Sequence, residues 1–293
     1  MSDSVAIILT TFNPDLAMLR DNISTYICQV GRVVVCDNSD DQDIALAIES
    51  FCHDRKKLIY LSMHGNKGIA YAQNRGVEYA ISEGFKLFIE IDQDSSLPSG
   101  YVEKILSSYY LLINNNIAVG GLGPIAKSKL QNFIYHEHKS DSSVFFVDKT
   151  LSSGFLYNKS AYHLVGGKDE SLFIDYVDWD WCWRANKLGL KVAIDNSIEI
   201  EHMLGDGHKK ILGFNVGLPS PIRLYYQYRN SLYMMQKSYI PFGWKVKRVF
   251  IQALKVPFFI VFTDRKKERL KYIVQGVIGF FKKEKGKLGG KNT

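Results

Sequence analysis

The sequence has 293 residues, of which 46% are hydrophobic and 23% charged, and this composition indicates a soluble protein with a substantial core. Four cysteines without a Cys-x-x-Cys pair exclude a disulfide framework and favour a reducing compartment. The net charge of +7 is unevenly distributed, because the residues from 221 on contain 17 Lys and Arg against 3 Asp and Glu. The preceding part is acidic, so we expect a body and a basic appendage with different tasks.

Buried strands alternate with helices over the first ~100 residues, which predicts a parallel sheet with right-handed crossovers. The sequence contains neither G-x-G-x-x-G after its first strand nor G-x-x-x-x-G-K-[ST]. Both absences argue against a dinucleotide-dependent dehydrogenase and a P-loop enzyme. The expected strands are 4–11, 32–37, 58–61 and 85–91, with helices from about 15 to 28, over 44–51 and within 65–84.

The second hundred residues are less regular. A helix over 98–113 is expected to pack on the sheet, and a helix over 178–188 ends before Gly189, a residue type that favours helix C-termini. Strands are expected over 117–122, 144–147, 151–157, 191–194 and 198–201, the third of them as a strand or a loop.

Polar clusters follow several of the expected strands, and the clearest is the carboxylate pair Asp92 and Asp94 after an apolar run. The carboxyl ends of parallel strands form the ligand-binding edge of an open sheet. Two converging hard oxygen ligands suit Mg²⁺ or Mn²⁺, and these ions suit a diphosphate. An acidic turn without a ligand is the structural alternative.

The order of these clusters carries a family resemblance. The segments TTFN, DNS, N-x-G-x-A-x-A-x-N-x-G and DQDS, followed by DESLFIDYVDWDWC-x-R and a histidine, resemble family 2 glycosyltransferases with the GT-A fold. Within that family they resemble bacterial rhamnosyltransferases that use dTDP-L-rhamnose. The resemblance covers most of residues 5–230 and implies an α/β fold, with a Rossmann-like, mostly parallel nucleotide-binding sheet flanked by helices.

The resemblance also implies the domain organisation. A GT-A catalytic domain would occupy residues 1–220, with a nucleotide-sugar half over about 1–100 and an acceptor half over about 101–220. Residues 221–293 would form a basic, helical, membrane-associating region.

The resemblance implies roles for the polar residues at the sheet edge. A metal ion, Mn²⁺ or Mg²⁺, would be held by Asp94 and His202, with Asp92 as a further ligand or a ribose contact. Donor-binding residues would be Thr11, Asn13, Asp37, Asn66, Gly68, Asn74, Asp92 and Gln93.

An inverting transfer needs a base that takes the proton of the acceptor hydroxyl, and the resemblance assigns this role to Asp178. Relatives often have Glu before this residue, whereas this chain has Val177, so Asp175 or Asp180 could share the task. A simple helix N-cap is the structural alternative for Asp178. Acceptor-side residues would be Gly154, Asp175, Trp179 and Arg229, although core packing is the simpler explanation for the tryptophans.

Two further features concern the acceptor side and the donor. Lys168 replaces the Phe of the Gly-Gly-Phe-Asp-Glu segment seen in relatives, and we expect this exchange to alter acceptor contacts. His208 lies in a glycine-containing segment, 204–217, that we interpret as a lid over the donor.

The basic end contains an aromatic helix over 223–236 and amphipathic segments over 246–262 and 270–281. Their apolar runs are too short to cross a bilayer, whereas lysine-framed amphipathic helices suit a membrane interface. A cap on the core or a homodimer interface is the alternative. No motif supports nucleic-acid binding.

The resemblance, taken together with these features, implies an inverting, metal-dependent transferase at the cytoplasmic face of a bacterial membrane. It would transfer L-rhamnose from dTDP-L-rhamnose to a lipid-linked saccharide in the synthesis of O-antigen, capsule or wall polysaccharide. One alternative is the same fold with UDP-galactofuranose or UDP-glucose as the donor, and another is a non-catalytic saccharide-binding module. A third is a nucleotidyltransferase, but this sequence lacks the Gly-rich or Arg/Lys signature of such enzymes after its first strand.

Overall fold

The computed structural model describes residues 2–128, 134–135, 143–202, 208–211 and 214–290. They pack as two compact units, and each is described by itself. The first unit comprises Met1–Glu170 and Asp178–Met203, and the second comprises Ser171–Val177 and Leu204–Thr293. The short segment Ser171–Val177 thus belongs to the second unit although the first unit precedes and follows it in the chain.

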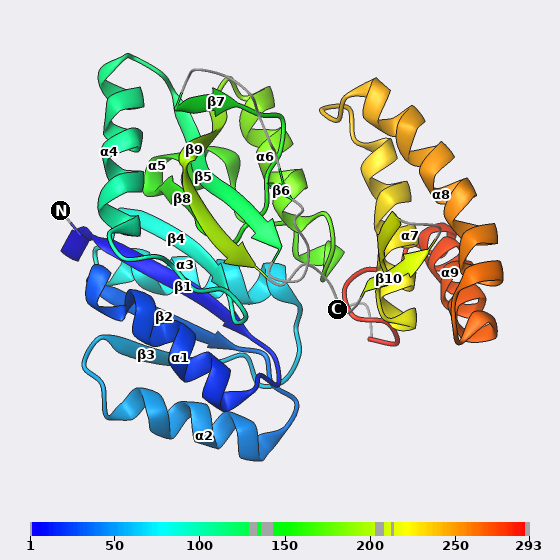
Figure 1. The fold of residues 1–293 in the computed structure, drawn as a ribbon, viewed down its shortest axis with the longest axis horizontal. Coiled ribbons are helices and arrows are strands. Elements are labelled where there is room, and N and C mark those ends of the chain that lie inside the picture. Colours follow the sequence, from blue (N-terminus) through cyan, green and yellow to red (C-terminus); the bar gives the residue numbers. More distant parts are fainter. Residues whose placement is uncertain (1, 129–133, 136–142, 203–207, 212–213, 291–293) are drawn as a thin grey trace. The chain divides into compact units, whose positions relative to one another are not determined.

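The first half of the large sheet is wholly parallel, as expected (Figure 1). Its strands lie in the order β3-β2-β1-β4, so that Thr11 is level with Asp37 and Thr10 with Asp92. The polar residues at the strand exits therefore lie along one edge. The elements are β1 Val5–Thr11, α1 Leu16–Tyr26, β2 Arg32–Asp37, α2 Gln42–His53, β3 Leu58–Ser62, α3 Ile69–Ser82 and β4 Leu87–Asp92.

The second half of the sheet is mixed. Strand β8 is antiparallel to both β4 and β5, whereas β5 and β9 run parallel. The elements are α4 Tyr101–Asn114, β5 Val119–Ser128, β6 Ile134–Tyr135, β7 Val144–Phe146, β8 Phe155–Asn158, α5 Lys159–Val165, α6 Val177–Lys187 and β9 Lys191–His202, with short 3₁₀ turns at Ser2–Ser4, Ile27–Gln29 and Glu170–Leu172.

The two short strands expected over 191–194 and 198–201 are a single strand, β9, and that expectation was wrong. The register with β5 shifts between Pro124 and Ile125, opposite Asp195 and Glu199. The Asp195 carboxylate accepts hydrogen bonds from the backbone and hydroxyl of Ser197, which stabilises the irregular turn. The polar residues that suggested an interruption between two strands thus form a bulge within one continuous strand.

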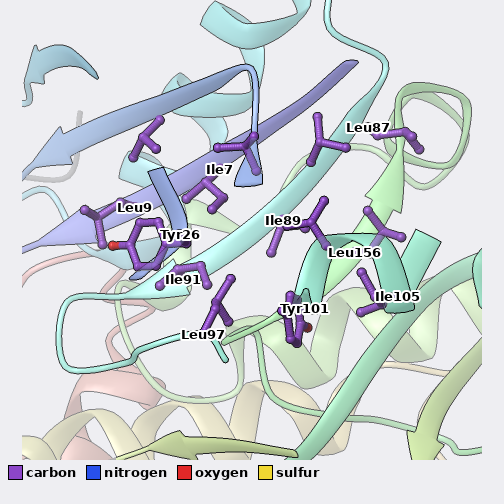
Figure 2. Packing of buried hydrophobic residues seen from close by; sticks show 14 of the residues in the cluster. Ile7, Leu9, Tyr26, Leu87, Ile89, Ile91, Leu97, Tyr101, Ile105 and Leu156 are labelled. Carbon is purple, nitrogen blue, oxygen red and sulfur yellow. The ribbon is translucent and has the colours of Figure 1, made fainter. Parts of the chain in front are cut away.

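Alternating residues of the central strands bury two cores. Ile7, Leu9 and Ile89 face one helical layer, which includes Tyr26 and Tyr101 (Figure 2). The other face of the same strands packs on helices α3, α5 and α6. This period-two alternation with apolar residues on both sides is what a sheet covered by two helical layers requires.

The second unit contains a hairpin, a three-helix assembly and the segment Ser171–Val177. Helix α7 begins at Pro221, a favoured first-turn residue, and packs closely on α9, where a Cβ on Gly276 would lie 2.5 Å from a backbone oxygen of Tyr225. No helix in the described ranges is long and apolar enough to cross a membrane. The elements are β10 His208–Ile211, β11 Phe214–Gly217, α7 Pro221–Gln236, α8 Phe242–Phe262 and α9 Lys266–Phe281.

Candidate active site

The exits of β1 and β2 are joined by a buried hydrogen-bond network around Asp37. Its carboxylate accepts from the hydroxyls of Thr11 at 2.8 Å, Ser39 at 2.6 Å and Tyr60 at 3.1 Å. Thr11 has no exposed surface, and Asp37 is 2% exposed. The Thr11 hydroxyl thus holds the Asp37 carboxylate in place, and the contact of Thr11 with a nucleoside stays a prediction.

The exits of β1 and β4 are joined by Gln93. Its side-chain amide accepts a hydrogen bond from the backbone N–H of Phe12 at 2.7 Å and donates to the carbonyl of the same residue at 3.3 Å. Asn13 follows with φ of 40° and accepts from the backbone N–H groups of Asp40 and Asp41. Gln93 and Asn13 thus shape the edge loops, and donor contacts by these two residues stay predictions.

Phe12 itself was not selected from the sequence, although its ring is 42% exposed at this edge. A large apolar residue directly after a buried strand is the signal that could have identified it. An exposed aromatic ring beside a polar edge can stack on a nucleobase.

Two of the predicted donor residues, Asn66 and Gly68, have structural roles in the turn before α3. The side-chain oxygen of Asn66 accepts from the N–H of Gly68 at 3.0 Å, and Gly68 has φ of +95°, a conformation that favours glycine. This glycine is therefore required by the turn itself. Close approach of its backbone to a ligand stays a prediction.

Asn74 is a buried residue that binds the backbone of Lys168. It is 4% exposed, and its amide donates to the carbonyl of Lys168 and to Glu170 while it accepts from the N–H of Lys168. Both amide hydrogens are used, so the residue holds a loop of the acceptor half. Donor binding by Asn74 stays a prediction.

The predicted metal ligands lie at adjacent strand ends. Asp92 ends β4, Asp94 lies in the following turn, and both are half-buried. An antiparallel bridge between Ser96 and Glu201 brings the end of β9, and with it the backbone of His202, next to this turn. The side chain of His202 and all of the side chains over 208–217, including His208, lie outside the described residues, as do residues 204–207 and 212–213 of the expected lid.

Two carboxylates with an imidazole are a donor set that fits Mn²⁺ or Mg²⁺. Among the described side chains, however, no group of three or more His, Cys, Asp or Glu converges as a metal site. The fit therefore rests on Asp92, Asp94 and the backbone position of His202.

Asp178 lies in the first turn of α6, where the helix dipole favours a carboxylate. It accepts a hydrogen bond from the N–H of Trp179 at 2.9 Å. Burial raises the pKa of Asp178 to about 6, against the attraction of Lys168, and the charge of Asp92 adds to the increase. A carboxylate with such a pKa can accept a proton near neutral pH and return it to solvent.

Lys168 is a buried residue, and an effect of its exchange on acceptor contacts stays a prediction. Its side chain is buried, and its ammonium nitrogen lies 3.0 Å from Oε2 of Glu90. Glu90 also accepts from the hydroxyl of Tyr157 at 2.8 Å. The residue that replaces the Phe of relatives is thus part of a buried ionic network beneath the site.

The predicted acceptor residues of the first unit divide into core and surface. Trp181 and Trp183 are core residues, whereas Trp179 is partly exposed, with the ammonium of Lys149 4.7 Å from its ring centroid. Gly154 is buried with φ of +79°, and a Cβ there would lie 2.8 Å from Pro124. Close packing thus requires a glycine at position 154. The side chain of Trp179 is exposed enough to contact an acceptor, and that contact stays a prediction.

The other two predicted acceptor residues belong to the second unit. Asp175 forms a bidentate ion pair with Arg223 at 3.1 to 3.2 Å and has φ of 65°. Arg229 is fully buried and donates to the carbonyls of Ser171, Leu172 and Gly286. The Arg229 side chain thus fixes the backbone of the segment Ser171–Val177, and its contact with an acceptor stays a prediction.

Comparison with known proteins shows what the chain is similar to. The pattern described as Glycosyl transferase family 2 matches residues 6–151. The chain is also 29% identical, over 301 residues that cover 99% of it and 98% of the relative, to the dTDP-rhamnosyl transferase RfbF of Shigella flexneri. These two similarities support an enzyme that resembles the family 2 glycosyltransferases. This result favours the enzyme over the non-catalytic binding module.

Solved structures show the GT-A fold. The first 349 residues of S. aureus TarS in complex with UDP-GlcNAc match with a TM-score of 0.53 at 14% identity, over 95% of this chain and 80% of that one. GalNAc-T7 with UDP, GalNAc and Mn²⁺ matches with a TM-score of 0.56 at 10% identity, over 95% of this chain. The glycosyltransferase spans only 56% of the GalNAc-T7 chain. These identities establish the fold alone.

Proposed function

We propose that the protein is an inverting, metal-dependent rhamnosyltransferase. It transfers L-rhamnose from dTDP-L-rhamnose to a lipid-linked saccharide in the synthesis of bacterial O-antigen, capsule or wall polysaccharide. The observation that carries the proposal is the half-buried Asp178, whose charge interacts with that of Asp92 at the exit of β4. The near full-length similarity to a dTDP-rhamnosyl transferase supports the choice of donor.

The residues perform distinct tasks in this proposal. Asp178 accepts the proton of the acceptor hydroxyl as that oxygen attacks the anomeric carbon, and the C–O bond to the diphosphate breaks. Asp92, Asp94 and His202 would hold the divalent cation, which when bound offsets the charge of the departing diphosphate. The exposed face of Trp179 suits a sugar ring of the acceptor.

The donor is tested with purified protein, Mn²⁺ and a panel of dTDP-L-rhamnose, UDP-galactofuranose and UDP-glucose. Release of the nucleoside diphosphate is measured with a lipid-linked disaccharide as acceptor, and the anomeric configuration of the product is determined. We expect release from dTDP-L-rhamnose with inversion. Release from UDP-sugars alone would support the alternative donors, and retention of configuration would contradict the role of Asp178.

We also propose that helices α8 and α9 bind an anionic bilayer surface at the cytoplasmic face of the membrane. Apolar side chains recur every three or four residues on α8 and are 39% to 79% exposed. Lysines flank the stripe and both ends of α9, and each contributes about 1 kcal/mol near an anionic surface. The stripe comprises Phe242, Val246, Val249, Phe250 and Leu254.

Vesicle flotation tests this surface. The substitution Phe250→Glu, at a ring that is 65% exposed, should abolish binding to phosphatidylglycerol vesicles. Phe146→Glu, at a 51% exposed ring of the first unit, is the matched control and should leave binding intact. Sedimentation is measured in parallel. If the wild type sediments as a dimer, Phe250→Glu sediments as a monomer and neither protein binds vesicles, the stripe is a homodimer interface instead.

A further inference from the structure

Helix α8 carries two cations on the face opposite its apolar stripe. Arg248 and Lys255 are seven residues apart, so they lie within about 20° of each other around the helix axis. Gln252 of the same helix donates to the hydroxyl of Ser231 on α7 at 2.6 Å. This side of α8 is therefore held against α7 within the second unit (Figure 1).

The segment 171–177 contacts arginines from both helices. The guanidinium of Arg248 donates a hydrogen bond to the hydroxyl of Tyr176, and its Cζ lies 4.9 Å from the centroid of that ring. The preceding residue, Asp175, forms the bidentate ion pair with Arg223 of α7. Asp175 and Tyr176 have φ of 65° and 68°, a conformation that is rare outside glycine and recurs at functional sites.

Lys255 adds a cation that is not neutralised. It is half-buried, and its ammonium forms no hydrogen bond or ion pair within the described parts of the chain. Burial lowers the pKa of Lys255 and Arg248 adds to the decrease, whereas Asp175 opposes it. The three acidic residues beyond position 220 have other partners, since Asp264, Glu268 and Glu284 bind Arg269, Arg265 and Tyr225. Such a cation favours the binding of an anion.

The charge of the cluster indicates which anion fits. Its described side chains are three cations, Arg223, Arg248 and Lys255, and one carboxylate, Asp175, which leaves a net charge of +2. A diphosphate that joins a lipid to a sugar carries a negative charge on each phosphate, whereas a phospholipid such as phosphatidylglycerol has a single charged phosphate. The stripe that we expect at the bilayer lies on the opposite face of α8. Charge and position therefore favour a lipid-linked diphosphate over the headgroups of the bilayer.

We propose that Arg223, Arg248 and Lys255 bind the diphosphate that joins the lipid of the acceptor to its saccharide. The inference rests on the proposed function in taking a lipid-linked acceptor, and it deepens that proposal by naming the group that the second unit recognises. Arginine forks bind phosphate oxygens through paired N–H groups, and a lysine adds a point charge. Tyr176 precedes the proposed base, Asp178, by two residues, which span at most about 7 Å of chain.

Calorimetry with farnesyl diphosphate, an apolar chain joined to a diphosphate, tests the site in the full-length protein. EDTA is present, so that no metal ion recruits the diphosphate to the donor site. Lys255→Met removes the charge and keeps most of the side chain, whereas Lys255→Arg retains a cation. Lys247→Met, at an exposed lysine of the same helix, is the matched control. Circular dichroism checks the fold of each variant.

We expect the affinity for farnesyl diphosphate to fall about tenfold in Lys255→Met and to stay within about twofold of the wild-type value in Lys255→Arg and Lys247→Met. The KM for the lipid-linked acceptor should rise about tenfold in Lys255→Met, with kcat nearly unchanged.

Two results would overturn the inference. One is equal affinity for farnesyl diphosphate in the wild type and a folded Lys255→Met, or no binding by either. The other is that Lys255→Met loses binding to phosphatidylglycerol vesicles but keeps its affinity for farnesyl diphosphate, because the cluster would then bind bilayer headgroups.

The binding measurement requires neither donor nor transfer activity. A wild type that binds farnesyl diphosphate through Lys255 but transfers no rhamnose would refute the proposed function and support the diphosphate site. Transfer from dTDP-L-rhamnose with the same acceptor KM in the wild type and Lys255→Met would refute the inference alone.

Discussion

Asp178→Asn should inactivate the enzyme and stabilise the fold at alkaline pH. The pKa of this carboxyl group is raised from 3.8 to about 6, so the folded protein binds the proton more tightly than the unfolded chain. The favourable contribution is fully present below pH 3.8 and is lost as the pH rises through about 6. Ionised Asp178 thus costs stability in the range where the enzyme works.

The pKa increase from 3.8 to about 6 corresponds to about 3 kcal/mol. Because the side chain is only half-buried and water can reach it, we reduce this figure to about 1–2 kcal/mol. An asparagine keeps the size of the side chain and the acceptor for the N–H of Trp179 without the charge.

Thermal unfolding at pH 4.5 and pH 8, with EDTA present, measures the difference. The gain in melting temperature on Asp178→Asn should be larger at pH 8 than at pH 4.5 by about 1–4 °C. Wild-type protein at both pH values provides the reference for all other titrating groups. An equal effect of the substitution at the two pH values would refute the reasoning.

Three further predictions concern the metal, the second unit and the core. EDTA and, separately, Asp94→Ala should abolish transfer without loss of fold measured by circular dichroism; full activity in both cases would contradict the metal proposal. Asn230→Ala removes hydrogen bonds to the carbonyls of the segment 171–177 and should lower the free energy of unfolding, measured by urea denaturation, by about 2–4 kcal/mol. A loss below about 0.5 kcal/mol would contradict the structural role of Asn230. Gly121→Ala places a Cβ 2.0 Å from the ring of Phe155 and should destabilise by about 1–3 kcal/mol, whereas Gly243→Ala, with open space around it, should not.

The sequence predicted the parallel half of the fold closely, because the apolar runs that favour strands there are also the segments that the folded protein buries. The apolar run that became β2 is buried over five of its six residues, and the expected bounds 32–37 match the strand. Strand β9 was divided in the expectation since its bulge contains Asp195 and Ser197, whose polar side chains resemble those of a turn. Pairing with a distant strand, which the sequence does not display, keeps the strand continuous.

The family motifs drew attention to several residues but did not reveal which hydrogen bonds their side chains make within the protein. Asn74 and Arg229 matched motif positions, yet both are buried and hold backbone groups in place. Lys168 appeared as a substitution on the acceptor side, and its partner Glu90 lay unnoticed within an apolar strand. A carboxylate in such a run indicates a buried cationic partner, but the sequence does not reveal which of the chain's 37 Lys and Arg it is.

Single-turnover transfer from dTDP-L-rhamnose with Mn²⁺, compared between wild type and Asp178→Asn, tests the central claim most directly. Donor binding is measured in parallel by calorimetry. We predict that the variant binds the donor with nearly wild-type affinity and loses at least about a thousandfold in the transfer rate, as expected for removal of a general base whose oxygen takes the acceptor proton. Wild-type transfer rates in a folded, donor-binding Asp178→Asn would contradict the account.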